Sequence, residues 1–320
     1  MTDTAADRST PAFPREADRS GRFVRQESVF RDWVTADGSS GYPAAAGRYH
    51  LYVSLACPWA SRTLIVRRLK RLEEAIGLTV LDPLRDERGW RFTAEEPDPV
   101  NGFAFLSEAY RASDPAFDGR VTVPVLWDKE RGRIVNNESA DIVRMLNSTF
   151  DALPGVATEV DLYPEPLRDE IDALNARIYE TVNNGVYRAG FATTQEAYEE
   201  AFDALFDSLA WLEERLADRR YLTGPTITEA DWRLFVTLVR FDVVYVGHFK
   251  CNLRRIDDHP NLAGYLRDLY QQPGIAETVD FDHIKRHYYM THPSINPTRI
   301  VPKGPLVDLR RPHGRERLGS

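Results

Sequence analysis

Cys57 stands where a thiol could act as a nucleophile, at the junction of a predicted strand and a predicted helix. The β-prone run 48–53 precedes it, and Pro58 suits the first turn of the helical pattern that follows. Free backbone N–H groups and the positive end of the helix dipole stabilise a thiolate at such a position. This context predicts a lowered thiol pKa and attack on sulfur, with an inert buried thiol as the alternative.

The segment after this cysteine looks like a thioredoxin-type Cys-x-x-Cys motif in which Ala60 replaces the second cysteine. Without a resolving thiol nearby, a mixed disulfide on Cys57 has to be cleared by an external thiol. The other cysteine, Cys251, lies far along the chain, and nothing in its sequence context suggests that it resolves such a disulfide. The inference is monothiol chemistry that uses a small soluble thiol.

Two short motifs extend this interpretation. In thioredoxin-like folds a proline before the third strand is cis and faces the active cysteine, and Pro124 matches that place. The backbone of Val123 could then pair with the peptide backbone of a bound thiol such as glutathione. Glu138 and Ser139 lie at a predicted helix start, where free N–H groups can receive a carboxylate, although Ser139 could equally be an ordinary N-cap.

The elements that must position these residues follow from the hydrophobic spacing. Residues 47–154 carry alternating strand and helix signals, with Gly77 ending the first helix, a second strand over 78–81 and a polar insertion over 85–118. Four helical stripes without a strand signal predict an all-helical domain over 155–290. Two outer segments are expected to lie on the surface: an N-terminal extension over 1–46 and a proline-rich tail over 291–320.

Composition excludes several classes of function. The chain has 49 acidic and 41 basic residues, and a net charge of −8 opposes nucleic-acid binding. It lacks the ~20-residue apolar run of a membrane span, and its first twenty residues hold no signal-like apolar run, so a soluble, cytoplasmic protein is expected. Two cysteines cannot form a disulfide framework. His283 and His287 have helical metal-ligand spacing, but no third ligand lies in motif range, and no metal is expected.

These features together resemble a glutathione transferase, which has a thioredoxin-like α/β N-terminal domain followed by an all-α C-terminal domain. Thr228 and Asp231, shortly after Gly224, resemble the N-capping box of that helical domain. Longer stretches are similar to the glutathionyl-hydroquinone reductases, the xi class of the family: residues 48–60, 121–128, 137–139, 183–187, 245–251, 283–289 and 294–297. Ser61 departs from the pattern of this class, which is expected to carry His there.

The resemblance implies a glutathione-dependent reduction of S-glutathionyl-hydroquinones. The Cys57 thiolate would attack the thioether sulfur, and a second glutathione would resolve the resulting disulfide, with glutathione as co-substrate and no tightly bound cofactor. The family uses tyrosines as general acids, and the matching positions are Tyr187, Tyr245 and Tyr288, with Tyr289 as an alternative to Tyr288. The implied glutathione contacts are Trp90, Arg120, Val123, Glu138 and Ser139. Family habit also implies a homodimer.

Two other functions remain open from the sequence. An omega-like dehydroascorbate or mixed-disulfide reductase would share Cys57 without needing the three tyrosines. A non-catalytic assembly module would use the same fold without an activated thiol. The sequence names neither the physiological quinone nor the thiol, since some bacteria use low-molecular-weight thiols other than glutathione.

Overall fold

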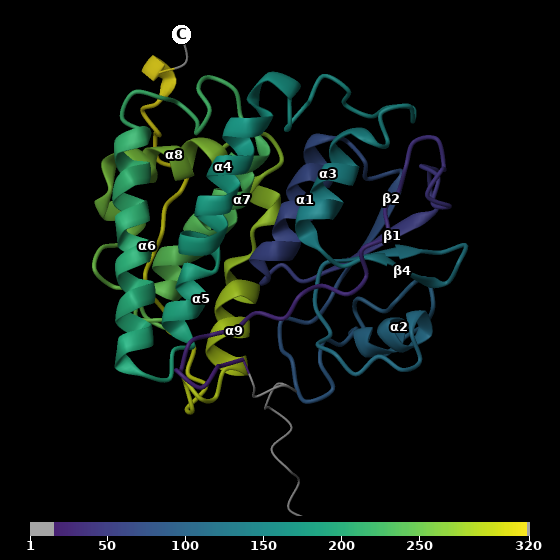
Figure 1. Ribbon diagram of the computed structural model, residues 1–320, viewed down its shortest axis with the longest axis horizontal. Coiled ribbons are helices and arrows are strands. Elements are labelled where there is room, and N and C mark those ends of the chain that lie inside the picture. Colours follow the sequence, from purple (N-terminus) through teal and green to yellow (C-terminus); the bar gives the residue numbers. More distant parts are fainter. Residues whose placement is uncertain (1–15, 319–320) are drawn as a thin grey trace, which may run out of the picture.

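The protein consists of a half built around a small sheet and a half built only of helices (Figure 1). The computed structural model describes residues 16–318. Residues 1–15 and residues 319 and 320 lie outside the described residues. The prediction that the first twenty residues contain no signal peptide falls mostly on this undescribed part.

A mixed four-stranded sheet in the order β2-β1-β3-β4 forms the centre of the first half. Strand β1 (Tyr49–Val53) pairs in parallel with β2 (Ile76–Val80) and antiparallel with β3 (Val125–Asp128), which pairs antiparallel with β4 (Arg133–Asn136). Helices α1 (Pro58–Leu69) and α3 (Ser139–Ser148) lie side by side on one face, and α2 (Leu106–Ser113) lies on the other (Figure 1). This is the thioredoxin-like arrangement that the sequence predicts.

Two local predictions in this half are wrong. Helix α1 ends at Leu69 instead of Gly77, and Arg71 takes the left-handed conformation beyond it, with φ of 54°. Gly77 instead lies inside β2 opposite His50, where a Cβ atom would come within 2.3 Å of the imidazole Nδ1. Glycine is needed there for close packing. The insertion over 85–118 also contains α2, which its polar composition concealed.

The second half consists of helices, and no strand occurs in it within the described chain. Two π-helical turns, Tyr179–Asn183 and Phe241–Tyr245, follow α4 and α7 directly. The helices are α4 (Arg168–Ile178), α5 (Gly185–Gly190), α6 (Gln195–Arg215), α7 (Glu229–Arg240), α8 (Pro260–Tyr270) and α9 (Phe281–Thr291). None of the helices within residues 16–318 is long and apolar enough to cross a membrane.

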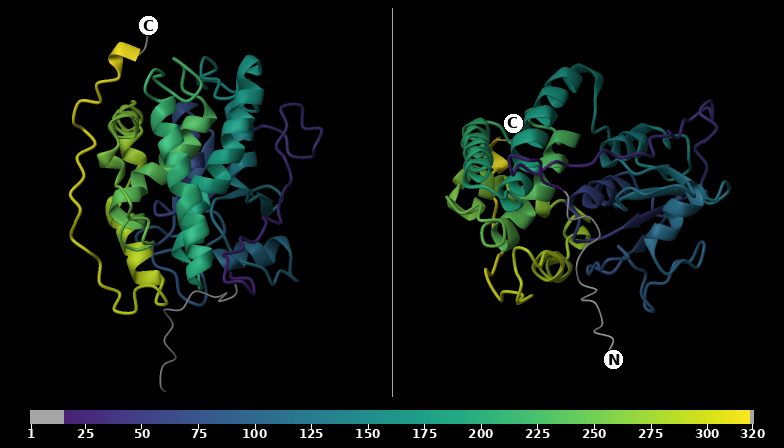
Figure 2. Two further views of the ribbon diagram at one scale, coloured as in Figure 1. Left: turned by 60° about the vertical axis from the view of Figure 1, so that its left-hand side comes forward. Right: turned by 60° about the horizontal axis from the view of Figure 1, so that its bottom comes forward.

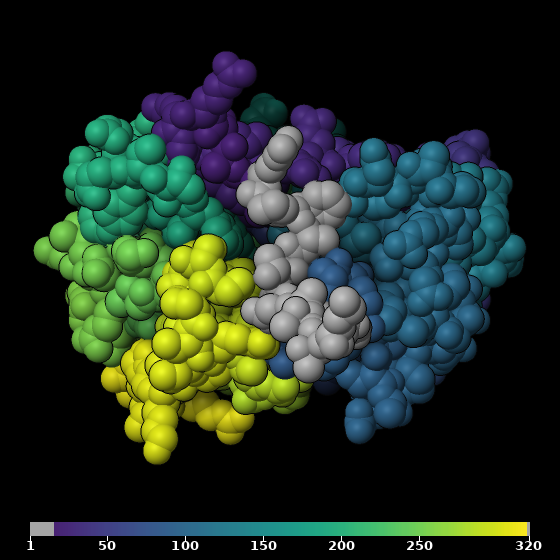
Figure 3. Space-filling view, turned by 90° about the horizontal axis from the view of Figure 1, so that it is seen from below, coloured from purple at the N-terminus to yellow at the C-terminus, as the bar shows by residue number. Residues whose placement is uncertain are grey.

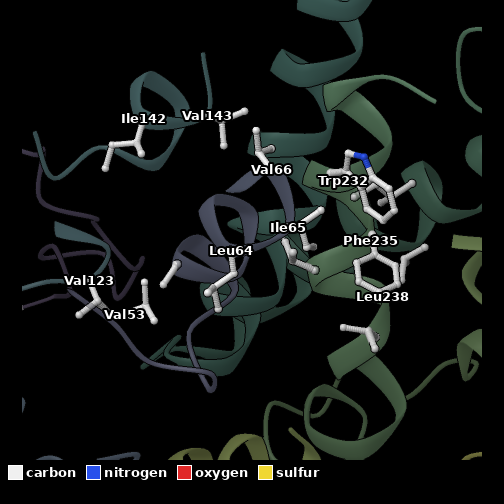
Figure 4. Packing of buried hydrophobic residues seen from close by; sticks show 14 of the residues in the cluster. Val53, Leu64, Ile65, Val66, Val123, Ile142, Val143, Trp232, Phe235 and Leu238 are labelled. Atoms are coloured by element: carbon white, nitrogen blue, oxygen red, sulfur yellow. The ribbon is translucent and has the colours of Figure 1, made fainter. Parts of the chain in front are cut away.

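Helix α1 joins the two halves, because it packs against α3 on one side and against α7 on the other (Figure 4). Val66 lies toward Val143 of α3, whereas Ile65 lies toward Phe235 and Leu238 of α7, and all five side chains are buried. Burial of one such side chain is worth about 1.5–3 kcal/mol. The start of α1, where Cys57 lies, is therefore held in a fixed place between the halves.

The extension crosses from the helical half to the sheet (Figure 2). At its start, the carbonyl of Gly21 accepts a hydrogen bond from the amide of Thr193 at 3.0 Å. Further along, the amide of Asp32 donates to the carbonyl of Val135 in β4 at 3.0 Å. The C-terminal tail runs along the outside of the helical half, where the buried Arg315 guanidinium donates to the Leu216 carbonyl at 2.9 Å (Figure 2).

The start of α7 has a reciprocal capping box between Thr228 and Asp231. The Asp231 carboxylate accepts from the amides of Thr228 and Leu222 at 2.7 and 2.9 Å, and from the Tyr265 hydroxyl at 2.8 Å. We expect Asp231→Ala to lower the free energy of unfolding by about 3 kcal/mol, because it leaves buried donors without an acceptor. Urea unfolding checks this, with the exposed Asp203→Ala on α6 as the control; equal midpoints for both variants would contradict it.

Candidate functional site

A pocket of about 360 Å³ lies between the two halves, which occupy opposite sides of the molecule when seen from below (Figure 3). Cys57 lines it together with side chains of both halves and of the N-terminal extension. Of the residues singled out in the sequence, the pocket wall contains Trp90, Arg120, Val123, Pro124, Glu138, Ser139, Tyr187 and Tyr288.

Cys57 is the N-cap residue of α1, with Pro58 in the first helical turn. Its thiol donates to the carbonyl oxygen of Val123, with 3.5 Å between Sγ and O. The peptide bond between Val123 and Pro124 is cis. The thiol and the backbone of Val123 therefore lie next to each other in the pocket wall.

A buried guanidinium supports the loop before this cysteine. Arg240, at the end of α7, donates from Nε to the carbonyl of Ala56 at 3.0 Å and from Nη2 to the carbonyl of Leu55 at 2.9 Å. Its Nη2 also donates to Ser61 Oγ at 2.7 Å, and the Ser61 hydroxyl donates to the Cys57 carbonyl. No carboxylate within residues 16–318 pairs with Arg240, so its charge acts on the thiol without being neutralised.

The pKa of Cys57 differs from the sequence-based expectation. Burial in the pocket raises the pKa of the thiol, while the amides of Ala60 and Trp59 and the guanidiniums of Arg240 and Arg25 lower it. The net shift is upward, so the prediction of a lowered pKa is wrong. The helix start does act on the sulfur as predicted, but the cost of placing an anion away from water is larger.

Glu138 and Ser139 begin α3, and Glu138 is its N-cap residue. The Glu138 carboxylate accepts from the Ala140 amide at 3.1 Å and from the Ser28 hydroxyl of the extension at 3.0 Å. Ser139 Oγ lies 3.5 Å from a nitrogen of the buried Arg62 guanidinium. This end of the pocket therefore presents a carboxylate and a hydroxyl to a ligand, while the Arg62 cation is buried behind Ser139 and does not line the pocket.

Trp90 and Arg120 form another part of the wall. The Trp90 ring lies between the Arg85 guanidinium, 5.0 Å from its centroid, and the His287 ring, stacked at 5.1 Å. Arg120 forms an ion pair with Glu16 at the start of the described extension. The guanidiniums of Arg85 and Arg120 thus make this part of the pocket wall cationic, although the chain as a whole is acidic.

The three tyrosines form one hydrogen-bonded chain. The hydroxyl oxygens of Tyr187 and Tyr288 are 2.5 Å apart, and those of Tyr288 and Tyr245 are 3.0 Å apart. Tyr187 and Tyr288 line the pocket, whereas Tyr245 is fully buried behind Tyr288. Burial raises the pKa of each hydroxyl, which keeps all three protonated at neutral pH. Tyr289 points elsewhere, since its hydroxyl donates to the Val243 carbonyl at 3.4 Å.

Tyr187 reaches this chain by a route that the sequence conceals. The run 183–185, Asn-Asn-Gly, is typical of a helix end, but here only Asn184 separates a π-helical turn over Tyr179–Asn183 from the start of α5. The buried side chain of Asn183 holds the turn in place. Its Nδ2 donates to Thr237 Oγ1 at 2.7 Å, and its Oδ1 accepts from the Arg62 guanidinium at 2.7 Å. The side chain after the turn is thereby directed into the pocket.

Sequence reasoning missed Arg25, which the extension brings into the pocket. Its guanidinium carbon lies 4.7 Å from the ring centroids of both Trp59 and Tyr187, and Nε donates to Asn184 Oδ1 at 2.7 Å. The polar composition around Arg25 gave no signal, because only the path of the extension across both halves places it beside Cys57.

Two other predicted features take no part in the pocket. Cys251 is fully buried in the helical half, its Sγ lies 3.8 Å from the Phe249 carbonyl oxygen, and burial raises its thiol pKa. His283 does not line the pocket, whereas His287 does. The part of the chain that the structure describes contains no group of three or more His, Cys, Asp and Glu that could hold a metal ion.

Comparison with known proteins identifies the family. A family model for the glutathione S-transferase N-terminal domain matches residues 56–149, and one for the C-terminal domain matches residues 195–268. Glutathionyl-hydroquinone reductase YqjG of Escherichia coli (strain K12) is 56% identical over 306 residues, covering 92% of this chain and 93% of that protein. The chain belongs to the xi-class glutathione S-transferases.

Further relatives agree with this assignment. Glutathionyl-hydroquinone reductase PcpF of Sphingobium chlorophenolicum is 55% identical over 90% of this xi-class chain and 91% of its own. The glutathione-bound structure of YqjG superposes with a TM-score of 0.88 over 90% of this chain and 96% of that one. The xi transferase ECM4 of Saccharomyces cerevisiae in complex with glutathione, 39% identical, also gives 0.88, over 92% and 99%.

Proposed function

We propose that this xi-class transferase reduces S-glutathionyl-hydroquinones to hydroquinones, with glutathione as the reductant and Cys57 as the nucleophile. The observation that carries the proposal is one pocket in which Cys57 faces Val123 on one side and the hydroxyl pair of Tyr187 and Tyr288 on the other. The names of relatives that share more than half of their residues with this chain support the same reaction.

The reaction takes place in two steps at sulfur. In the first, the Cys57 thiolate attacks the thioether sulfur; a disulfide bond forms, the bond from carbon to sulfur breaks, and its electron pair passes to the ring carbon. That carbon takes a proton, which completes the hydroquinone. In the second, the thiolate of another glutathione attacks the glutathionyl sulfur, which releases glutathione disulfide and regenerates the Cys57 thiolate.

The proton needs a donor, because an aryl carbanion is a poor leaving group. Tyr187 and Tyr288 supply hydroxyls that are protonated at neutral pH, and Tyr245 supports Tyr288 from behind with a hydrogen bond at 3.0 Å. A hydrogen-bonded row of this kind spreads the charge that a donating hydroxyl leaves behind. We assign Tyr187 and Tyr288 as the general acids and Tyr245 as the residue that orients Tyr288.

Glutathione is placed by the other walls. In this proposal Glu138 and Ser139 bind the α-amino and carboxylate groups of its γ-glutamyl end, and Val123 pairs with its backbone. Trp90 and Arg120 hold the other end, where a carboxylate meets the cationic wall.

The enzyme needs no resident cofactor, since both electrons come from thiols. It works in the cytoplasm, where glutathione is kept reduced, and as a homodimer; an elution volume of a single 36.5 kDa chain would contradict the dimer.

Paired assays test the function. Turnover of a glutathionyl-hydroquinone by the purified protein, followed by hydroquinone release, is the expected result. Faster turnover of dehydroascorbate or a glutathione mixed disulfide, with none of the thioether, would favour the omega-like alternative. Absence of both activities in the wild type would favour a non-catalytic role for the pocket, and retention of both in Cys57→Ser would show that Cys57 is not the nucleophile.

The extension contributes to the chemistry through Arg25. We expect Arg25→Gln to raise the pKa of the Cys57 thiol further, because a positive charge that favours the thiolate is removed. Alkylation by iodoacetamide will then be several-fold slower at neutral pH, and its rate will rise only at a higher pH than in the wild type. Arg22→Gln is the control, since Arg22 lies on the same extension but pairs with Glu200 outside the pocket. Superimposable pH profiles for both variants would refute the role of Arg25.

A further inference from the structure

His287 is a pocket residue to which the proposed mechanism gives no task. It lies on α9 beside Tyr288, its ring stacks on Trp90 with an interplanar angle of 14°, and it is 7% exposed. Its ring centroid is 5.3 Å from that of Tyr288. The imidazole thus stands in the pocket wall next to one of the proposed general acids.

The hydrogen bonding of the imidazole fixes which nitrogen carries the proton. Nδ1 lies 2.6 Å from the carbonyl oxygen of Pro83. A carbonyl can only accept, so Nδ1 is the donor and bears the hydrogen. Burial, with the nearby cations of Arg85 and Arg120, lowers the pKa of His287 to about 3, so the ring is neutral throughout the physiological range. Its second nitrogen, Nε2, therefore holds a lone pair and no proton.

This lone pair has no partner in the protein. No residue among 16–318 donates a hydrogen bond to Nε2, although the side chain lines the pocket. Two other acceptors of the pocket are assigned to glutathione in the proposed function, where the Val123 backbone pairs with its peptide and the Glu138 carboxylate binds its α-amino group. His287 thus offers an open acceptor beside Tyr187 and Tyr288, which both bring hydroxyl donors.

We propose that His287 is a specificity-determining residue, whose Nε2 accepts a hydrogen bond from a free ring hydroxyl of the hydroquinone substrate. The inference rests on the proposed function and deepens it. A hydroquinone carries hydroxyl donors that a quinone or an aryl ether lacks. A site with a buried acceptor discriminates against a ligand without the matching donor, because the acceptor would lose its contact with water and gain nothing in return. The substrate class is therefore aryl thioethers with at least one unblocked hydroxyl.

Binding measurements test this without depending on turnover. In full-length Cys57→Ser protein, the affinities of a glutathionyl-hydroquinone and of its two mono-O-methyl ethers are measured by calorimetry. We expect the parent to bind about tenfold more tightly than one of the ethers. His287→Phe, which keeps a ring to stack on Trp90 but has no acceptor, should abolish that preference and leave the ether affinity unchanged. His287→Gln, which can place an oxygen near the position of Nε2, should restore part of it.

The outcomes separate this inference from its alternatives. Equal weakening of all three ligands by His287→Phe would overturn it in favour of a structural role or a contact with glutathione, and an unchanged preference would overturn it outright. The far-UV circular dichroism spectrum reports whether the variant is folded. If His287→Phe does not fold, His287→Asn, which retains a donor for the Pro83 carbonyl, takes its place under the same criteria. Failure of the wild type to turn over any glutathionyl-hydroquinone would refute the proposed function instead, whatever the binding preference. Tyr289→Phe is the matched control, since Tyr289 lies outside the pocket.

Discussion

Replacing Cys57 by alanine is expected to lower kcat/KM for a glutathionyl-hydroquinone by about 10³-fold or more, because no other thiol can take its place. Cys251 is buried in the helical half and does not line the pocket. Cys57→Ala removes a side chain without removing the Arg240 contacts, which are made to backbone carbonyls and to Ser61. The loss will therefore reflect chemistry and not unfolding.

The matched variant is Cys251→Ala, which removes the other thiol. We expect it to keep thioether turnover within about twofold, with a modest loss of stability from the small cavity. Hydroquinone release followed by chromatography measures both variants. Substantial residual turnover in Cys57→Ala, or its disappearance in Cys251→Ala, would show that the nucleophile has been assigned to the wrong residue.

The second large effect is expected for Tyr288→Phe, which should lower kcat for the thioether. It removes the hydroxyl that links Tyr187 and Tyr245, and with it a proton donor to the ring carbon. We expect kcat for the thioether to fall by about 10²-fold, the usual contribution of one general acid. The reduction of a small glutathione mixed disulfide should change by less than about threefold, because its thiolate leaving group needs no proton.

The neighbour in sequence provides the control for Tyr288. Tyr289→Phe removes a hydroxyl that bonds to the Val243 carbonyl, outside the pocket, and should leave both activities near those of the wild type. A Tyr288→Phe variant that loses thioether and disulfide turnover to the same extent would indicate a positioning or folding role. The proposed general acid chemistry would then be wrong.

Local features that depend on neighbouring residues could be predicted well. The strand, the cysteine and Pro58 follow one another, so the N-cap position of Cys57 was available from the sequence, as were the alternation of strands and helices in the first half and the helical second half. The capping interaction at Thr228 is equally local, since its partner is three residues away. The family resemblance brought Val123 and Tyr288 to notice, and both line the pocket.

Features that depend on contacts between distant segments could not be predicted. Gly77 ends no helix, because its role is set by the His50 ring across the sheet. The upward shift of the Cys57 pKa arises from burial by both halves, which no local pattern records. Arg25 and Arg240 reach the cysteine from positions far away in the sequence, and neither lies in a recognisable motif.

The central claim is that turnover passes through a disulfide between Cys57 and glutathione, and a single-turnover reaction tests it most directly. The enzyme is mixed with one equivalent of glutathionyl-hydroquinone without free glutathione, and its peptides are analysed by mass spectrometry. The proposed mechanism predicts one equivalent of hydroquinone and one glutathionyl group on the peptide that contains Cys57, and addition of glutathione should remove that group. Release of hydroquinone while Cys57 remains unmodified would contradict it.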